Sequence, residues 1–206
     1  MGFLASSSAR KKVAREAAAL LYFGIEKEYR QAKLRAAKTL GVHILPTNLE
    51  VAMELDKIAE ENEGAVRQER LIQMRREALK VMKVLEKYNP ILVGSVWRGT
   101  IYRESDIDIT IYHNEPEDIV KLLGREKLRV LESGWVTVTK RGKVRKQFRI
   151  ILEMPTGEKV EITVRGAEEL GVEERCEIYG DVVSGLNIQT LERILLGNPT
   201  QRFVPL

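Results

Sequence analysis

The feature that most constrains the fold is a run in which acidic and apolar side chains alternate, Asp106-Ile107-Asp108-Ile109. Successive side chains of a β-strand point to opposite faces of its sheet. The run therefore predicts a strand over 106–112, with isoleucines on the core face and both aspartates on the other face. Two carboxylates held this close repel each other unless a cation lies between them. Hard divalent cations bind carboxylate oxygens and share them with phosphates, so Asp106 and Asp108 are candidate ligands of such a cation.

A Gly-Ser turn precedes this run. Leu92-Val93-Gly94-Ser95 is a short apolar segment that ends in the turn, and residues 96–105 separate it from the first aspartate. Gly94 lets backbone N–H groups approach phosphate oxygens, because it has no side chain to collide with them. Ser95 adds a hydroxyl donor and opens a predicted helix over 95–102, whose first amides favour anions. Gly94 and Ser95 are therefore predicted to bind the phosphates of a nucleotide.

Together these residues resemble the signature of the nucleotidyltransferase superfamily of DNA polymerase beta. That signature is an apolar residue, Gly-Ser, a spacer and then Asp-apolar-Asp-apolar. The longer run GSVWRGTIYRESDIDI is most similar to archaeal CCA-adding tRNA nucleotidyltransferases, which share the Arg-Gly-Thr after Gly-Ser. The resemblance implies transfer of a nucleoside monophosphate from a nucleoside triphosphate to a hydroxyl, with Mg²⁺ as the cofactor (two ions) or Mn²⁺ in its place.

The resemblance also implies a third carboxylate, between apolar residues on a later strand. Val160-Glu161-Ile162 fits this position, because alternation places Glu161 on one face and its apolar neighbours on the other. Its alternative role is a surface residue paired with a lysine. Glu153, between Leu152 and Met154 on the preceding predicted strand, is the other candidate for the third carboxylate. Members of the superfamily mostly carry aspartate here, so the role of a longer glutamate stays open.

Basic residues supply candidates for binding the triphosphate or a nucleic-acid acceptor. Arg98 lies one helical turn after the Gly-Ser turn, where CCA-adding enzymes commonly carry a basic residue; its alternative role is a salt bridge to Glu104. Residues 137–149 contain six basic residues and no acidic one. The alternative for this segment is an ordinary solvent-exposed hairpin. Five of its residues are candidates for holding a polyanion: Lys140, Arg141, Lys143, Arg145 and Lys146.

The pattern along the chain predicts an α+β protein with three regions. Residues 1–88 form a helical N-terminal region, with predicted helices over 9–40, from the Thr47/Glu50 capping box to residue 61, and from residue 65 to residue 88. Residues 89–166 form the nucleotidyltransferase core, and residues 167–206 a C-terminal helical segment and tail. The core has predicted strands at 91–93, 106–112, 136–139, 146–153 and 159–165, and a predicted helix at 115–123. We expect a mixed β-sheet with helices against one face.

Composition bounds the remaining possibilities. No apolar run approaches the ~20 residues of a membrane span, and the single Cys176 excludes an intramolecular disulfide, so we expect a cytoplasmic protein that does not bind a membrane. The abundance of Lys, Arg and Glu is typical of a thermophile. His43 and His113 have no partner at metal-binding spacing. Trp97 and Trp135 are more typical of the core or its edge than of a base-stacking site.

Two classes of function fit these features. The first is a nucleotidyltransferase that binds a nucleoside triphosphate and uses RNA as its acceptor, or alternatively a protein or a small molecule. The RNA acceptor follows from the CCA-like motif and from the basic segments at 1–40 and 137–149. The second is a nucleic-acid-binding protein built on the same fold without catalysis. In either class the N-terminal helices are candidates for a homodimer interface.

Overall fold

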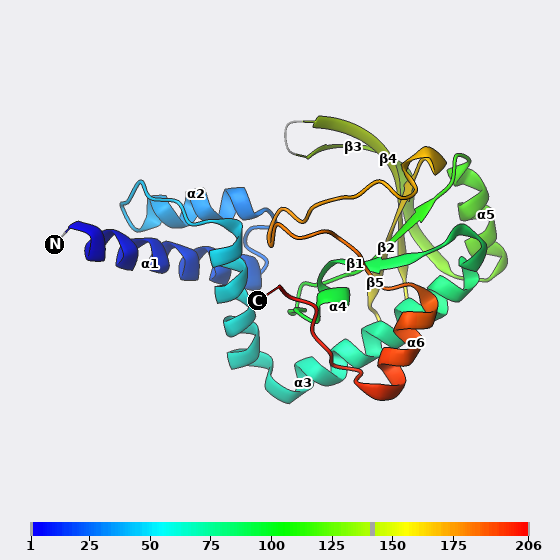
Figure 1. Ribbon diagram of the computed structural model, residues 1–206, viewed down its shortest axis with the longest axis horizontal. Helices are drawn as coiled ribbons and strands as arrows, with labels where there is room; N and C mark the ends of the chain where they lie inside the picture. The colour runs from blue at the N-terminus through cyan, green and yellow to red at the C-terminus, as the bar shows by residue number, and fades with distance from the viewer. Residues whose placement is uncertain (1, 141–142, 206) are drawn as a thin grey trace.

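The computed structural model describes residues 2–140 and 143–205, and the side chains of residues 7–138 and 144–205. Its first half is helical, with α1 (Gly2–Tyr22), α2 (Tyr29–Thr39), α3 (Asn48–Val84) and the short 3₁₀ helix η1 (Glu86–Tyr88). A five-stranded sheet follows, interleaved with α4 (Gly94–Arg98), α5 (Pro116–Arg125), the 3₁₀ helix η2 (Ala167–Glu169) and α6 (Ile188–Gly197) (Figure 1). The predicted α+β architecture is confirmed.

The sheet has the strand order β1-β2-β5-β4-β3. Its strands are β1 (Ile91–Val93), β2 (Ile107–Tyr112), β3 (Arg129–Lys140), β4 (Lys143–Glu153) and β5 (Lys159–Arg165). β2 and β5 run parallel and the other neighbours run antiparallel, so the sheet is mixed, as predicted. β5 has the predicted bounds, whereas β3 extends well beyond the predicted 136–139. The predicted helix over 95–102 is too long, because Gly99 takes a left-handed φ of +72° and ends α4.

Alternation along β2 and β5 separates the two faces of the sheet. Ile107, Ile109 and Ile111 are buried in the main core with Val160 and Ile162 of the neighbouring strand. The second half of α3, α5 and α6 contribute apolar side chains to the same core. Asp108 and Glu161 occupy the intervening positions and therefore lie on the other, polar face. The predicted division of β2 into an apolar and an acidic face is confirmed.

The N-terminal helices have a hydrophobic core of their own. α1, α2 and the first half of α3 bury a second cluster that includes the small residues Ala17, Ala32 and Ala36. The prediction of one helix over 9–40 is wrong, because the chain leaves the helical conformation after Tyr22, passes through Gly24 at a φ of +66° and resumes at Tyr29.

The helix α3 joins the two cores. The predicted break near residue 64 is a kink, since Gly64 has φ +51° and ψ −129° within an otherwise continuous helix. Figure 1 shows the two halves of α3 running in different directions from this point. Residues after the kink, from Leu71 to Tyr88, belong to the core of the sheet. The predicted boundary at residue 88 therefore assigns to the N-terminal region a helical segment whose side chains pack in the core of the sheet.

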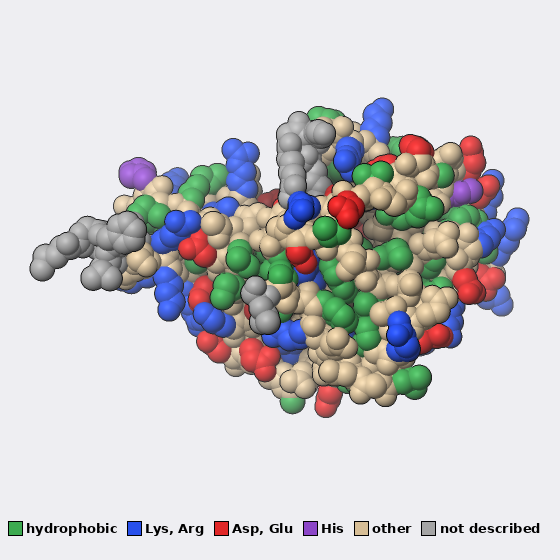
Figure 2. Space-filling view, viewed as in Figure 1, with side chains coloured by type: hydrophobic (Ala, Val, Ile, Leu, Met, Phe, Trp, Pro, Cys, Tyr) green, Lys and Arg blue, Asp and Glu red, His purple; other side chains and the backbone are tan. Residues whose placement is uncertain are grey.

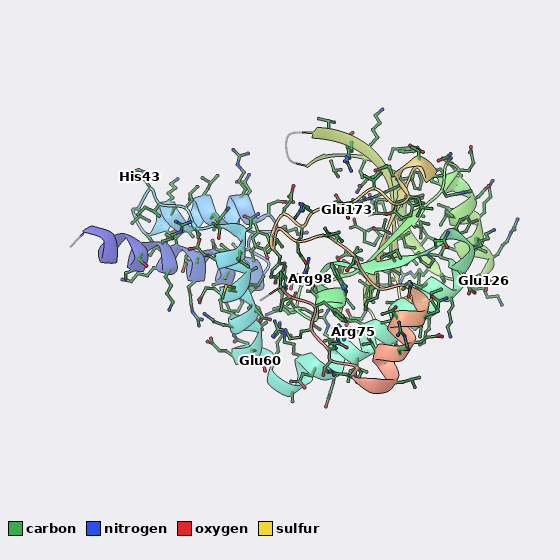
Figure 3. All side chains as sticks on the ribbon, viewed as in Figure 1. His43, Glu60, Arg75, Arg98, Glu126 and Glu173 are labelled. Carbon is green, nitrogen blue, oxygen red and sulfur yellow. The ribbon has the colours of Figure 1, made fainter. Side chains whose placement is uncertain are left out.

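Residues 170–187, here called the crossing loop, connect η2 to α6. The loop runs from the sheet toward the N-terminal helices and back, and it returns to the sheet where Leu186 pairs with Leu92 (Figure 1). After α6 the C-terminal tail passes close to α4, and the buried Arg75 of α3 donates to carbonyl oxygens of both. Its four acceptors lie at 2.6–3.1 Å and belong to Val96, Trp97, Pro199 and Gln201. Figure 3 labels Arg75 on α3, next to α4. Among the described residues, no helix combines the length and apolarity needed to cross a membrane.

Candidate active site

The three predicted carboxylates lie on the polar side of β2 and β5, although, among the described residues, no three such side chains converge on one point. Asp108 pairs in register with Glu161 across the two parallel strands, and Asp106 stands two residues before Asp108 on the same face. Neighbouring strands lie about 4.8 Å apart, so side chains at one register position are direct neighbours. Burial, followed by repulsion from Glu161 and Asp106, raises the pKa of Asp108 to about 7. Burial and the charge of Asp106 also raise the pKa of Glu161, against the opposing effect of Arg149.

Neither aspartate is neutralised within the described part of the chain. Asp106 and Asp108 form no hydrogen bond or ion pair with any described residue. Burial raises the pKa of Asp106 as well, although the more distant charges of Lys159 and Arg70 oppose this rise. Asp106 is exposed and Asp108 is half-buried. A half-buried carboxylate without donors is unfavourable to folding unless a ligand supplies the missing charge. The pair is therefore a candidate site for a cation.

The donor set suits a hard divalent cation. Among the described residues, no three acidic, histidine or cysteine side chains already converge closely enough to form a finished metal site. Asp108, Glu161 and Asp106 nevertheless repel one another, and a cation between them would remove that repulsion. Carboxylate oxygens are the ligands that Mg²⁺ and Mn²⁺ prefer. The residues present thus fit such an ion.

The two candidates for the third carboxylate differ in their partners. Glu161 lies beside Asp108, and its nearest cation is Arg149, whose Nη1 atom is 3.9 Å from Oε2 of Glu161. That distance is at the outer limit of an ion pair, and the partner is an arginine where the alternative role anticipated a lysine. Glu153 lies on β4, one strand farther from β2, and is bound by Arg129. Glu161 is therefore the less engaged carboxylate and the one nearer to Asp108.

The Gly-Ser turn packs directly on Asp108. Gly94 has a φ of +70°, and a Cβ atom placed on it would lie 1.9 Å from Oδ2 of Asp108. The glycine is therefore required by the carboxylate itself, in addition to any phosphate. Ser95 is half-buried, and its hydroxyl has no hydrogen-bond partner among the described residues. This hydroxyl is free to donate to a ligand.

A cavity of about 810 Å³ opens beside this turn, between the sheet, the N-terminal helices and the crossing loop. Cavities of this size hold nucleotide-sized ligands. Asp106 and Glu161 are not part of its lining, whereas Asp108 is. From the sheet and α4 the lining includes Gly94, Ser95, Asp108 and Thr163, and from the N-terminal helices Tyr29, Arg30 and Lys33.

Arg98 lines the cavity but is already engaged. The buried guanidinium donates to both carboxylate oxygens of Asp181 at 2.7 and 3.1 Å. It also lies 4.3 Å from the ring centroid of Trp97 and 4.5 Å from that of Tyr179. The alternative pairing of Arg98 with Glu104 is wrong, since the acidic partner is Asp181. Arg98 therefore anchors the crossing loop over the cavity.

Arg30 and Lys33, two cations of the N-terminal helices that line the cavity, form no ion pair with a described residue. Arg30 is exposed. Lys33 donates from Nζ to Oδ1 of Asn48 at 2.7 Å, and burial lowers its pKa. Both side chains line the cavity across from Asp108. They are available to bind an anionic ligand there.

The predicted polyanion-binding segment lies in the β3–β4 hairpin. Arg145 faces the cavity and its Nη1 atom lies 3.6 Å from Oε2 of Glu169, whereas Lys146 forms no ion pair with a described residue. On the face seen in Figure 2, basic side chains project over the N-terminal helices and around this hairpin, with acidic side chains between them. The remaining candidates lie outside the residues whose side chains are described: Lys140, Arg141 and Lys143.

Sequence reasoning missed a clamp at the start of β2 and β5. Arg70, on α3, binds both carboxylate oxygens of Glu158 at 2.7 and 2.8 Å. It also donates to the carbonyl oxygens of Tyr102 and Ser105 at 2.9 and 3.1 Å. Ser105 directly precedes Asp106, and Glu158 directly precedes β5, so one guanidinium fixes the entry to both strands. No spacing in the sequence links Arg70 to partners 32 and 88 residues away.

Comparison with known proteins gives a family match that includes the Gly-Ser turn and the three carboxylates. Residues 75–167, a little under half of the chain, match the family model described as a nucleotidyltransferase domain. No curated protein matches the sequence.

Solved structures that resemble the chain do so distantly. A cytoplasmic RNA terminal U-transferase has 18% sequence identity and a TM-score of 0.35, over 54% of this chain and 35% of its own. Cid1 in complex with the UTP analogue UMPNPP has 18% identity and a TM-score of 0.35, over 54% and 36%. The GLD-2/RNP-8 complex has 14% identity and a TM-score of 0.36, over 60% and 41%. The chain thus spans well under half the length of the structures it matches.

Proposed function

We propose that this nucleotidyltransferase domain is an active, divalent-cation-dependent enzyme that transfers a nucleoside monophosphate from a nucleoside triphosphate to a hydroxyl of RNA. The observation that carries this proposal is the setting of Asp108. Its carboxylate is pressed against Gly94, lies beside Glu161 and Asp106, and has no donor among the described residues. Such repulsion is unfavourable to the fold, and a role in binding a catalytic cation explains it.

The reaction exchanges one phosphorus–oxygen bond for another. The acceptor hydroxyl oxygen forms a bond to the α-phosphorus while the bond to the bridging oxygen breaks. Pyrophosphate leaves with the bonding electrons, and the hydroxyl proton is released. Mg²⁺ held by Asp106, Asp108 and Glu161 would stabilise the negative charge on the attacking and leaving oxygens.

The protein's own groups bind and orient the reactants in this proposal. The hydroxyl of Ser95 donates to a phosphate oxygen, and Gly94 leaves room for both that phosphate and Asp108. Arg30 and Lys33 attract the anionic reactants from the opposite wall. Arg98 acts indirectly, because its pairing with Asp181 holds the crossing loop over the cavity.

Two features support RNA as the acceptor in this proposal. The run GSVWRGTIYRESDIDI resembles archaeal CCA-adding enzymes, which supports the 3′ end of an RNA as the acceptor. Cations without acidic partners on two sides of the cavity, at Arg30 and Lys146, also support a polyanion.

Transfer of label from each of the four α-labelled nucleoside triphosphates tests the proposal, with Mg²⁺ or Mn²⁺ and with total RNA or a protein extract as acceptor. We expect label on RNA, and we expect the Asp106→Asn/Asp108→Asn double variant to abolish it. Asp118→Asn on α5 is the matched control, because Asp118 is exposed and its ion pair among the described residues is with Lys121. Label on protein instead of RNA would identify a protein as the acceptor and contradict the RNA part of the proposal. No label on any acceptor, with RNA still bound, would contradict the proposal and favour a binding protein on this fold.

A further inference from the structure

The indole of Trp135 is exposed on the β3–β4 hairpin. Trp135 pairs in register with Phe148, which belongs to the main core, yet 61% of Trp135 is accessible to solvent. The two rings meet in a T-shaped contact with centroids 5.4 Å apart and an interplanar angle of 83°. The indole of Trp135 therefore contacts the edge of the core through Phe148, and the rest of its surface faces solvent. Most of a large, rigid aromatic surface is left for a ligand.

A second cavity of about 220 Å³ lies beside this indole. Trp135, Phe148 and Lys146 line it, and register pairing places all three on the same face of the hairpin. Lys146 and Arg165 line both this cavity and the larger one at Asp108, so the two cavities adjoin. The indole lies on the face of the sheet opposite to Asp108 and Glu161, so a chain-like ligand that reached both cavities would pass around the hairpin.

Both basic and acidic side chains line this cavity, namely Lys146, Arg165, Glu168 and Glu169. Arg165 and Glu169 are paired with Glu174 and Arg145, whereas Lys146 has no ion-pair partner among the described residues. Residues 137–149 supply six basic residues and no acidic one. An apolar partner covering Trp135 would also cover the charged ends of Lys146 and Glu168, neither of which forms an ion pair with a described residue, and this is unfavourable. A ligand that alternates flat aromatic groups with phosphates satisfies both features.

We propose that Trp135 and Lys146 form a binding site for single-stranded nucleic acid, in which a base stacks on the indole and the neighbouring phosphate pairs with the ammonium. As an acceptor-strand site it rests on the proposed function, because the strand would leave the cavity at Asp108 and pass this face. Base–aromatic stacking tolerates any base. A duplex does not fit, because its bases are already stacked on each other.

Binding of a short labelled oligouridylate, measured by fluorescence anisotropy without nucleotide or divalent cation, tests the stacking part. We expect Trp135→Leu to weaken binding about 5- to 100-fold. Trp135→Phe should retain most of the affinity, because it keeps an aromatic face of smaller size. Thermal unfolding of both variants checks that the hairpin is intact. Equal affinity of wild type and Trp135→Leu would overturn the site.

Salt dependence tests the phosphate part. Each lost phosphate contact should reduce the slope of log affinity against log salt by about 0.7 for a single strand. We expect this reduction in Lys146→Gln. Lys12→Gln on α1 is the charge-matched control, because Lys12 is exposed and forms no ion pair with a described residue. The same reduction in both variants would mean attraction by net charge alone and would overturn the assignment of Lys146.

Intrinsic fluorescence gives a direct signal. The chain has two tryptophans; Trp97 is only 3% exposed but lines the large cavity, so the part of the quenching that is lost in Trp135→Phe reports on Trp135. We expect saturable quenching by the single strand and little by the corresponding duplex. Equal quenching and affinity with the duplex would overturn the proposal.

Comparing this titration with the transfer assay, on the wild type and on the Asp106→Asn/Asp108→Asn variant, separates this inference from the proposed function. Binding that depends on Trp135, in a protein that transfers no nucleotide even as wild type, would uphold the site and refute the enzyme. Nucleotide transfer to RNA, together with RNA binding that does not depend on Trp135, would support the enzyme and refute the Trp135 site.

Discussion

At the scale of single residues, Asp108 links stability to function. Its pKa rises from 3.8 to about 7 in the folded protein, chiefly because of burial. Between these two values the folded state holds a proton that the unfolded state has released. The free energy of unfolding therefore falls as pH rises through this window, and the whole penalty is present above it. A bound cation would offset the penalty, because it stabilises the ionised form.

Asp108→Asn should therefore stabilise the protein at alkaline pH. Without divalent cations we expect a gain of roughly 1–3 kcal/mol at about pH 8 that disappears near pH 4, since a neutral amide carries no ionisation penalty. Urea unfolding at both pH values measures the gain. Mg²⁺ should narrow the gap by stabilising the wild type alone. Equal stability of the two proteins at pH 8 would contradict the raised pKa.

Gly94 should be intolerant of a methyl group because of Asp108. The added Cβ would lie 1.9 Å from Oδ2 and would hold a left-handed φ. We expect Gly94→Ala to lower the free energy of unfolding by about 1–3 kcal/mol. Part of this loss should be recovered in the Asp108→Ala background, as a double-mutant cycle would show. Gly134→Ala is the control, because nothing lies within 4 Å of its Cβ and its φ is ordinary; equal losses at both glycines would contradict the contact.

At the scale of elements, Arg70 of α3 ties the loop before β2 to the turn before β5. Its guanidinium has four hydrogen bonds to these two segments. Because the carboxylates lie at the start of these strands, their separation depends on this clamp. Groups that orient ligands in this way typically change metal affinity or activity about 10- to 100-fold when removed.

Arg70→Gln should accordingly raise the Mg²⁺ concentration needed for half-maximal nucleotide transfer, by about 10-fold or more. Arg129→Gln removes an arginine from an exposed pair with Glu153 and should leave this concentration unchanged. A magnesium titration of the transfer rate, with the unfolding temperature measured alongside, distinguishes the two. An Arg70→Gln protein with lower stability but an unchanged magnesium requirement would show that the clamp is only structural.

Local periodicity explains which elements could be predicted. Alternation placed Asp108 and Glu161 on one face, because strand geometry depends only on neighbours in the chain. The partner of Arg98 could not be found in this way, since Asp181 is 83 residues away in an irregular loop. The break between α1 and α2 was also missed, because an isolated glycine is tolerated in many helices.

At the scale of the whole molecule, the large cavity lies between the two parts of the chain that hold the hydrophobic cores. α3 connects them through Gly64, whose φ of +51° and ψ of −129° lie outside the helical region. The direction of the first half of α3, and with it the wall that carries Arg30 and Lys33, depends on this single residue.

Gly64→Ala should destabilise the protein by about 1–3 kcal/mol, because alanine strains this backbone conformation. Lack of space is not the cause, since nothing lies within 4 Å of the added Cβ. Gly124→Ala in α5 is the matched control and should stabilise the protein by about 0.5–1 kcal/mol, because Gly124 has ordinary helical geometry. Urea unfolding compares the two; a neutral effect at Gly64 would contradict the fixed kink.

A homodimer through the N-terminal helices stays a prediction at this scale. Apolar side chains exposed near that end include Phe23, Leu34 and Met53. Sedimentation equilibrium of the wild type and of Leu34→Glu would detect a dimer formed there, and a monomeric wild type would contradict it.

The most direct measurement is the rate of nucleotide transfer by Glu161→Gln compared with Glu153→Gln. Both variants replace a strand carboxylate by an amide of the same size, but only Glu161 is the register partner of Asp108. We predict a fall of roughly 100-fold or more for Glu161→Gln and an unchanged rate for Glu153→Gln. The opposite pattern, or full activity in both variants, would contradict the assignment of the three carboxylates as the catalytic centre.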